Sequence, residues 1–150
     1  MRRGLCAVIA CAGCSYSSLD DEIFPELLGA EVAVESAAPT DAAIIDVRLA
    51  LRGGPTASAD AVIDRIVLED PAIVGSQAEL LELAVGFPAG FDAYIGGSET
   101  KVVDLENHGT TNAELAGLCG SALTMRLYLA DADEPNTWWL ATRPVTVACN

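Results

Sequence analysis

The feature that most constrains the fold is an alternation of apolar and other residues with a period of two. Residues 45–52 and 123–130 both place an apolar side chain at every second position, with charged, polar or small side chains between them. Successive side chains of a strand point to opposite faces of a sheet, so this spacing gives one apolar and one solvated face. We therefore expect both segments to be strands that bury one face in a core.

Further apolar or alternating runs are separated by glycine, proline and asparagine, at 31–35, 62–69, 80–87, 101–105 and 138–149. About seven such strands predict an all-β fold, an antiparallel immunoglobulin-like β-sandwich over residues 31–150. The polar segment 131–137 would join the last two strands as a hairpin, and Pro144 would mark an edge or a bulge. Residues 76–79 also fit a helix capping box, so a short helix is the alternative at that point.

The charge balance excludes one class of partner. The chain has 150 residues, enough for one domain, and its 8 Lys and Arg against 22 Asp and Glu give a formal net charge of −14. Phosphate backbones bind to clusters of basic side chains, which such a surface lacks. We therefore expect no nucleic-acid partner, and we attribute most of the acidity to solubility.

The first fourteen residues have the order of an export signal. Met1-Arg2-Arg3 is basic, residues 4–12 are apolar, and small residues follow. Ala10-Cys11-Ala12 would suit an ordinary signal peptidase that cuts after Ala12 and leaves a plainly secreted protein. A retained N-terminal segment is the third alternative.

Cys11-Ala12-Gly13-Cys14 resembles the lipobox of bacterial lipoproteins, although Cys11 stands where leucine is usual. This resemblance implies a signal peptide of residues 1–13, cleavage before Cys14 and lipidation of Cys14. It also implies export and anchoring to a membrane of the cell envelope. Ser15 after the cysteine favours the outer membrane or cell surface by the enterobacterial sorting rule. Residues 14–30, with their serines and acidic residues, would form a lipidated tether.

The number of cysteines favours the lipobox cut. The chain has five, an awkward number for an exported protein. A cut before Cys14 removes Cys6 and Cys11 and leaves Cys14 for the lipid, so Cys119 and Cys149 remain as one pair. We expect these two to form a disulfide, since disulfides persist in oxidising compartments. Two free buried thiols are the alternative.

A second, local resemblance concerns residues 103–109. This alternating run ends in Asn107-His108-Gly109 and is similar to an edge of CARDB-type immunoglobulin-like modules. The resemblance implies a turn at these residues, because asparagine and glycine accept the left-handed conformation. It agrees with the β-sandwich expected from the strand pattern.

Two groups of residues could carry chemistry. The acidic loop residues Asp131, Asp133 and Glu134 could bind Ca²⁺, although the loop lacks the glycine and distal glutamate of an EF-hand. Trp138 and Trp139 should face opposite sides of a strand, so one would be buried while the other could contact a sugar or a protein.

No catalytic, cofactor or metal site is predicted. His108 is the only histidine, and no serine lies in a nucleophile elbow. The sequence therefore favours a non-catalytic, membrane-anchored binding or structural module of the cell envelope, with a protein or carbohydrate partner. The alternative is an envelope hydrolase that works through unpaired acidic residues.

Overall fold

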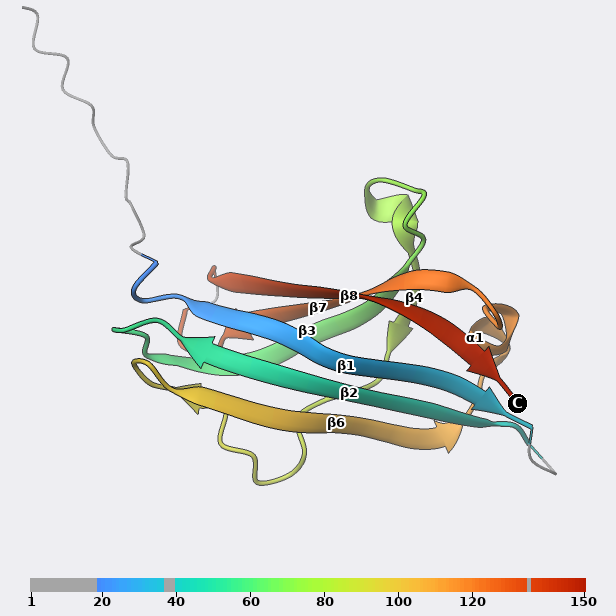
Figure 1. The fold of residues 1–150 in the computed structure, drawn as a ribbon, viewed down its shortest axis with the longest axis horizontal. Coiled ribbons are helices and arrows are strands. Elements are labelled where there is room, and N and C mark those ends of the chain that lie inside the picture. The colour runs from blue at the N-terminus through green and yellow to red at the C-terminus, as the bar shows by residue number, and fades with distance from the viewer. Residues whose placement is uncertain (1–18, 37–39, 135) are drawn as a thin grey trace, which may run out of the picture.

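The protein is almost entirely β-structure. The computed structural model describes residues 19–36, 40–134 and 136–150 (Figure 1). Its elements in chain order are β1 (Ile23–Glu35), β2 (Ala42–Gly53), β3 (Ala59–Glu69), a 3-10 turn (Ser76–Ala78), β4 (Glu79–Leu83), β5 (Tyr94–Ile95), β6 (Thr100–Thr110), α1 (Ala113–Gly117), β7 (Ala122–Asp131) and β8 (Trp138–Cys149). The predicted all-β class and the terminal hairpin are confirmed.

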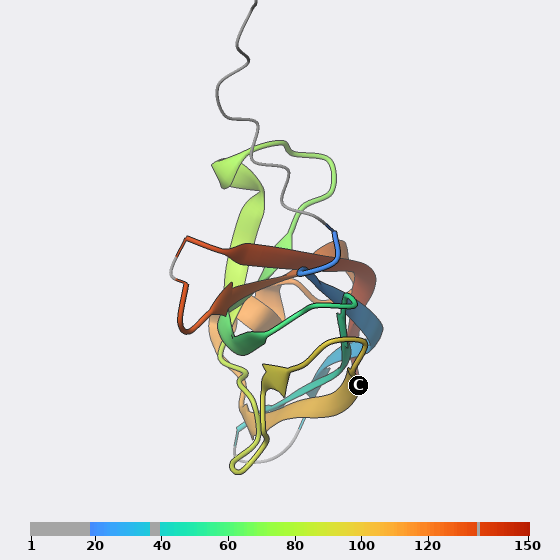
Figure 2. The same cartoon turned by 90° about the vertical axis from the view of Figure 1, so that its left-hand side faces the viewer.

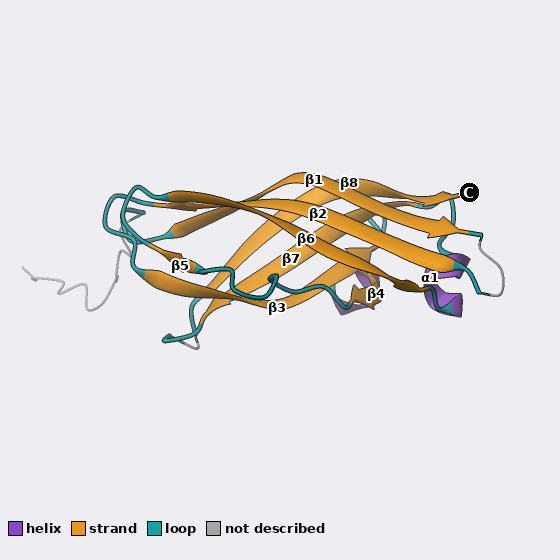
Figure 3. Ribbon diagram, turned by 90° about the horizontal axis from the view of Figure 1, so that it is seen from below, coloured by secondary structure: helices purple, strands orange, loops and turns teal. Residues whose placement is uncertain are grey.

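The strands form one curled sheet in the order β4-β3-β7-β8-β1-β2-β6, with β5 paired to β3. Figures 2 and 3 show how the curl brings the two halves of the sheet face to face, as in a sandwich. All strand pairs are antiparallel except β1 with β8, which run parallel over Val32–Val34 and Val147–Cys149. The prediction of a purely antiparallel sheet is therefore wrong at the join between the first and last strands.

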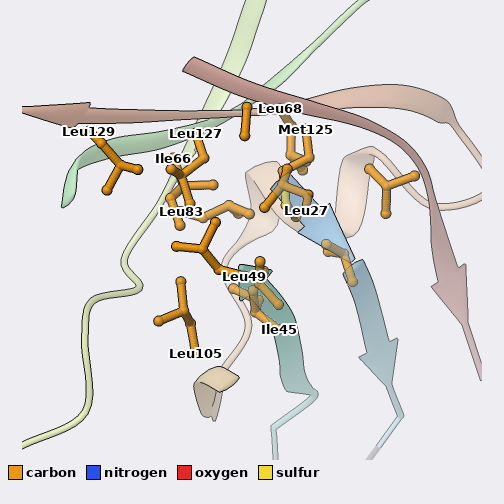
Figure 4. Packing of buried hydrophobic residues seen from close by; sticks show 14 of the residues in the cluster. Leu27, Ile45, Leu49, Ile66, Leu68, Leu83, Leu105, Met125, Leu127 and Leu129 are labelled. Atoms are coloured by element: carbon orange, nitrogen blue, oxygen red, sulfur yellow. The ribbon is translucent and has the colours of Figure 1, made fainter. Parts of the chain in front are cut away.

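The interior contains the apolar faces that the alternation predicts. Leu49 and Leu51 of β2, and Leu127 and Leu129 of β7, are all 0% exposed. Figure 4 shows side chains from both halves of the sheet meeting in this core, among them Leu27, Ile45, Ile66, Leu68, Leu83, Leu105 and Met125. Full burial of one such side chain contributes about 1.5–3 kcal/mol, so this interdigitation is the main source of stability.

The predicted tether of residues 14–30 is wrong over its second part, because β1 begins at Ile23. Ile23 and Leu27 are both in the core. The strand tolerates Pro25 because of where its nitrogen points. The N–H of Gly53 donates to the carbonyl of Glu99, the residue before β6, so the odd-numbered residues of β2 direct their backbone groups toward β6 and the even-numbered ones toward β1. Their partners Phe24 and Glu26 face β2 in return. The backbone of Pro25 therefore faces away from β2, where no ladder bond is lost.

Two local predictions meet different outcomes. The short helix considered at the capping box of residues 76–79 is present only as a single 3-10 turn, whose N-cap is Gly75 without a side-chain hydrogen bond. The strand β4 begins directly after this turn. The expected turn at Asn107-His108-Gly109 is wrong, because all three residues lie inside β6. The pairing of β6 with β2 over its whole length keeps this segment extended.

No helix in the part of the chain that the structure describes is long and apolar enough to cross a membrane.

Candidate binding site at the open end of the sandwich

A cavity of about 270 Å³ lies between the start of β1 and the β7–β8 loop. Its walls carry carboxylates, hydroxyls and one indole ring, from Asp21, Glu22, Thr56, Ser58, Ala59, Asp131, Glu134, Thr137 and Trp139. No ion pair between a basic side chain and these four carboxylates is present among the described residues. The cavity therefore suits a ligand that is cationic or rich in hydrogen-bond donors.

The chain leading into β1 is held against the β2–β3 loop, which brings two walls of the cavity together. The N–H of Gly54 donates to the carbonyl of Glu22 at 2.9 Å, and the N–H of Thr56 donates to the carbonyl of Asp20 at 2.7 Å. A Cβ atom at position 54 would lie 2.5 Å from the carbonyl oxygen of Asp20. Glycine is thus required for this approach.

The acidic loop forms the third wall. Asp131 ends β7 and is only 7% exposed, and its Oδ1 accepts the N–H of Asp133 at 3.0 Å. The Thr137 hydroxyl donates to Oε2 of Glu134 at 3.2 Å. The structure thus brings Asp131 and Glu134 into the cavity, whereas Asp133 is not part of its lining.

The calcium idea gains no support from this geometry. Within residues 19–36, 40–134 and 136–150, no three His, Cys, Asp or Glu side chains are grouped so that they could hold a metal ion. The loop carboxylates instead make hydrogen bonds that shape the loop itself.

The tryptophan prediction is confirmed. Trp139 is 7% exposed and lines the cavity, whereas Trp138 is 52% exposed on the opposite face of β8. Leu140 is also exposed on this outer face. Val62 of β3 is exposed as well, and it pairs across the sheet with Ala130 of β7, which in turn pairs with Trp138. The outer surface near the cavity therefore carries several exposed apolar side chains.

One edge of β8 runs beside the cavity without a partner strand. The N–H of Val147 donates to Ser121, and its carbonyl accepts from Gly120, so the odd-numbered residues of β8 face β7. Antiparallel ladders alternate, and the pairing of β7 with β8 has no register shift, so Trp138, Leu140 and Thr142 direct their N–H and C=O groups away from β7. Within the part of the chain that the structure describes, no strand pairs with this edge, since β1 joins β8 only from Val147 onward.

We call the gap between this edge of β8, Trp138–Pro144, and the facing edge of β1, Ile23–Leu27, the open seam. Figure 1 shows the two strands converging toward the C-terminus, where their ladder lies. Near the convergence the Arg143 guanidinium crosses the seam and donates to the carbonyl of Leu27 at 3.0 Å. Pro25 and Pro144 both present their ring nitrogens to the seam, so neither can donate a ladder bond across it.

The predicted pairing of Cys119 with Cys149 is present as a disulfide, with 5.7 Å between the Cα atoms. It ties the chain just after α1 to the last residue of β8. The predicted lipidation site Cys14 lies outside the described residues, as do the predicted signal peptide and the first residues of the predicted tether.

His108 lies exposed on β6 opposite Ile44 near the start of β2, whereas the cavity lies beyond the other end of β2. Its Nε2 is 2.6 Å from Oδ1 of Asp46 on β2. The hydrogen bond to Asp46, followed by the attraction of its charge, raises the pKa of His108 above the ordinary value. His108 is thus an exposed strand residue with a side-chain partner, and it does not lie in the turn that the sequence suggested.

This pair predicts a specific dependence of stability on pH. A raised pKa in the folded state means that the pair stabilises the fold fully below the unfolded pKa of about 6.5 and loses this contribution as pH rises through the folded pKa. The melting temperature of wild type should therefore exceed that of His108→Gln most below pH about 6, with the gap closing in alkaline buffer. Asp46→Asn should behave in the same way, and a gap that widens with pH would contradict the assignment.

Sequence reasoning did not single out six residues of the cavity, namely Asp21, Glu22, Thr56, Ser58, Ala59 and Thr137. Asp21 and Glu22 had a visible signal in the acidic run that precedes β1, but their position before the first strand favours a tether. Thr56 and Ser58 lie in an ordinary loop pattern between β2 and β3 and carry no signal of their own.

No protein-family model matches the chain, and no curated protein matches it. Among solved structures, the chain is similar to one described as "X-ray structure of Northeast Structural Genomics Consortium target SoR45", with 12% identity and a TM-score of 0.47 over 87% of this chain and 89% of that one.

Proposed function

We propose that the protein is an exported bacterial lipoprotein, anchored through Cys14, whose β-sandwich is a non-catalytic binding module of the cell envelope. The observation that supports export is the Cys119–Cys149 disulfide. It uses both cysteines that follow Cys14 in the sequence, so a cut at Gly13–Cys14 leaves no spare thiol apart from the one that takes the lipid.

The binding role rests on the open seam. Exposed, uncharged strand edges pair readily with other chains, and folded proteins usually protect them. Here such an edge lies directly beside an oxygen-lined cavity. A module that presents both features on one end is suited to hold a partner at the envelope surface.

We expect the full chain, expressed in a bacterium that processes lipoproteins, to begin at Cys14 and to carry added acyl mass in the membrane fraction. Cys14→Ser should lose the acyl mass and leave the membrane fraction, because one thiol supplies the attachment point. Intact mass spectrometry of both forms measures this. A wild-type chain that begins at Gly13 without lipid would show plain secretion instead, and Ser15→Ala serves as the matched control that keeps the anchor.

The second candidate function, an envelope hydrolase, is favoured by one observation: four carboxylates line the cavity around Trp139. General acid and base catalysis needs two such groups. Turnover of an envelope polysaccharide by the purified protein, lost in Asp131→Asn, would decide for the hydrolase.

A further inference from the structure

We propose that the open seam accepts an extended segment of a partner protein, which adds as a strand to the free edge of β8 and places a basic side chain in the adjacent acidic cavity. This inference rests on the proposed binding role and specifies the chemistry of its partner. Strand addition satisfies the backbone groups of an edge, while side-chain pockets select the sequence that binds.

The first argument is the contrast between the free edges of the sheet. The outward-facing residues of β6 include Asp104, Glu106 and His108, and the short β4 carries Glu79 and Glu82. Charges of this kind protect an edge against pairing. The edge of β8 has none between Trp138 and Thr142, and its Trp138 and Leu140 side chains are about half exposed.

The second argument is that the fold keeps the seam from closing on itself. Pro25 and Pro144 remove N–H donors from the two facing edges, and Arg143 takes the Leu27 carbonyl that a neighbouring strand would otherwise use. Among the described residues, the backbone groups of Trp138, Leu140 and Thr142 that point away from β7 belong to no strand ladder. They form a short row of donors and acceptors at the spacing of an extended chain.

The third argument is charge. Asp21, Glu22, Asp131 and Glu134 lie at the wide end of the seam, next to Trp138. A lysine or arginine of the incoming segment would meet uncompensated carboxylates there, and Trp139 lines the same cavity. A second copy of this chain is a poor occupant by the same reasoning, because the full sequence has a formal net charge of −14 and loss of Arg2 and Arg3 with the signal peptide would make each copy more acidic still.

The test uses the purified protein as processed by its host and two synthetic peptides of about ten residues. In one peptide lysine alternates with valine and threonine, and in the other glutamate replaces each lysine. We expect the lysine peptide to bind at least about tenfold more tightly than the glutamate peptide by calorimetry. Amide hydrogen exchange should slow at Trp138, Leu140 and Thr142, and not at Val102 or Asp104 on the edge of β6.

Thr142→Pro removes one free N–H donor and should weaken binding of the lysine peptide by about tenfold. Val102→Pro, the matched change on the β6 edge, should leave the affinity for this peptide unchanged. The exchange measurement on wild type stands even if a variant fails to fold. Absence of binding, equal binding of both peptides, or protection elsewhere would overturn the proposal. Protection of the same three amides without peptide, together with dimers in solution, would assign the seam to a second copy and overturn it too. Lipid on Cys14 is measured separately, so its presence or absence is independent of each result.

Discussion

The double variant Cys119→Ser/Cys149→Ser is expected to have a free energy of unfolding about 3–4 kcal/mol lower than wild type. The disulfide closes a loop with a sequence separation of 30 residues, which restricts the unfolded chain. Loss of the bond should also loosen the end of β8, where the parallel pairing with β1 spans only Val147–Cys149. Urea denaturation followed by tryptophan fluorescence measures the change, since Trp139 is buried in the folded state.

The control for this experiment is wild type with the disulfide reduced. Reduced wild type and the double variant should agree, because both lack the same cross-link while their other contacts are the same. A difference of less than about 1 kcal/mol between oxidised wild type and the double variant would show that the cross-link contributes little. The domain would then be held by its core alone.

The pairing of β1 with β8 is also a feature of the fold that could not be predicted from the sequence. The segments 45–52 and 123–130 could be predicted because burial of one face imposes a period of two on the residues themselves, and both lie within strands as expected. The parallel pairing of the first and last strands joins residues more than a hundred positions apart. No local pattern records such a contact, so the mixed character of the sheet follows only from the topology.

The first half of β1 could not be predicted as a strand for a different physical reason. Pro25 and Gly29 favour turns, so this stretch resembles a linker. In the structure the nitrogen of Pro25 faces the open seam, and a register shift between Leu27 and Gly29 absorbs the irregularity. A strand edge can therefore contain such residues where no partner needs their N–H groups.

The cavity likewise has one wall that the sequence could indicate and one that it could not. The sequence could single out one wall because its residues Asp131, Glu134 and Trp139 lie close together in the chain, in or beside one hairpin loop. The opposite wall comes from the chain before β1 and from the β2–β3 loop, which meet only through backbone hydrogen bonds such as Thr56 to Asp20. Its composition thus depends on a contact that the alternating pattern does not specify.

Leu127→Ala should lower the free energy of unfolding by about 2–5 kcal/mol. Leu127 is 0% exposed at the centre of β7, with Ile66 of β3 and Ala141 of β8 as its neighbours across the sheet. Truncation leaves a cavity that these strands cannot fill, because their ladders hold them in place. Leu80→Ala removes the same atoms from a side chain that is 41% exposed, so it should cost less than about 1 kcal/mol in the same urea titration. Equal losses in the two variants would mean that the two halves of the sheet do not pack around Leu127 as the fold requires.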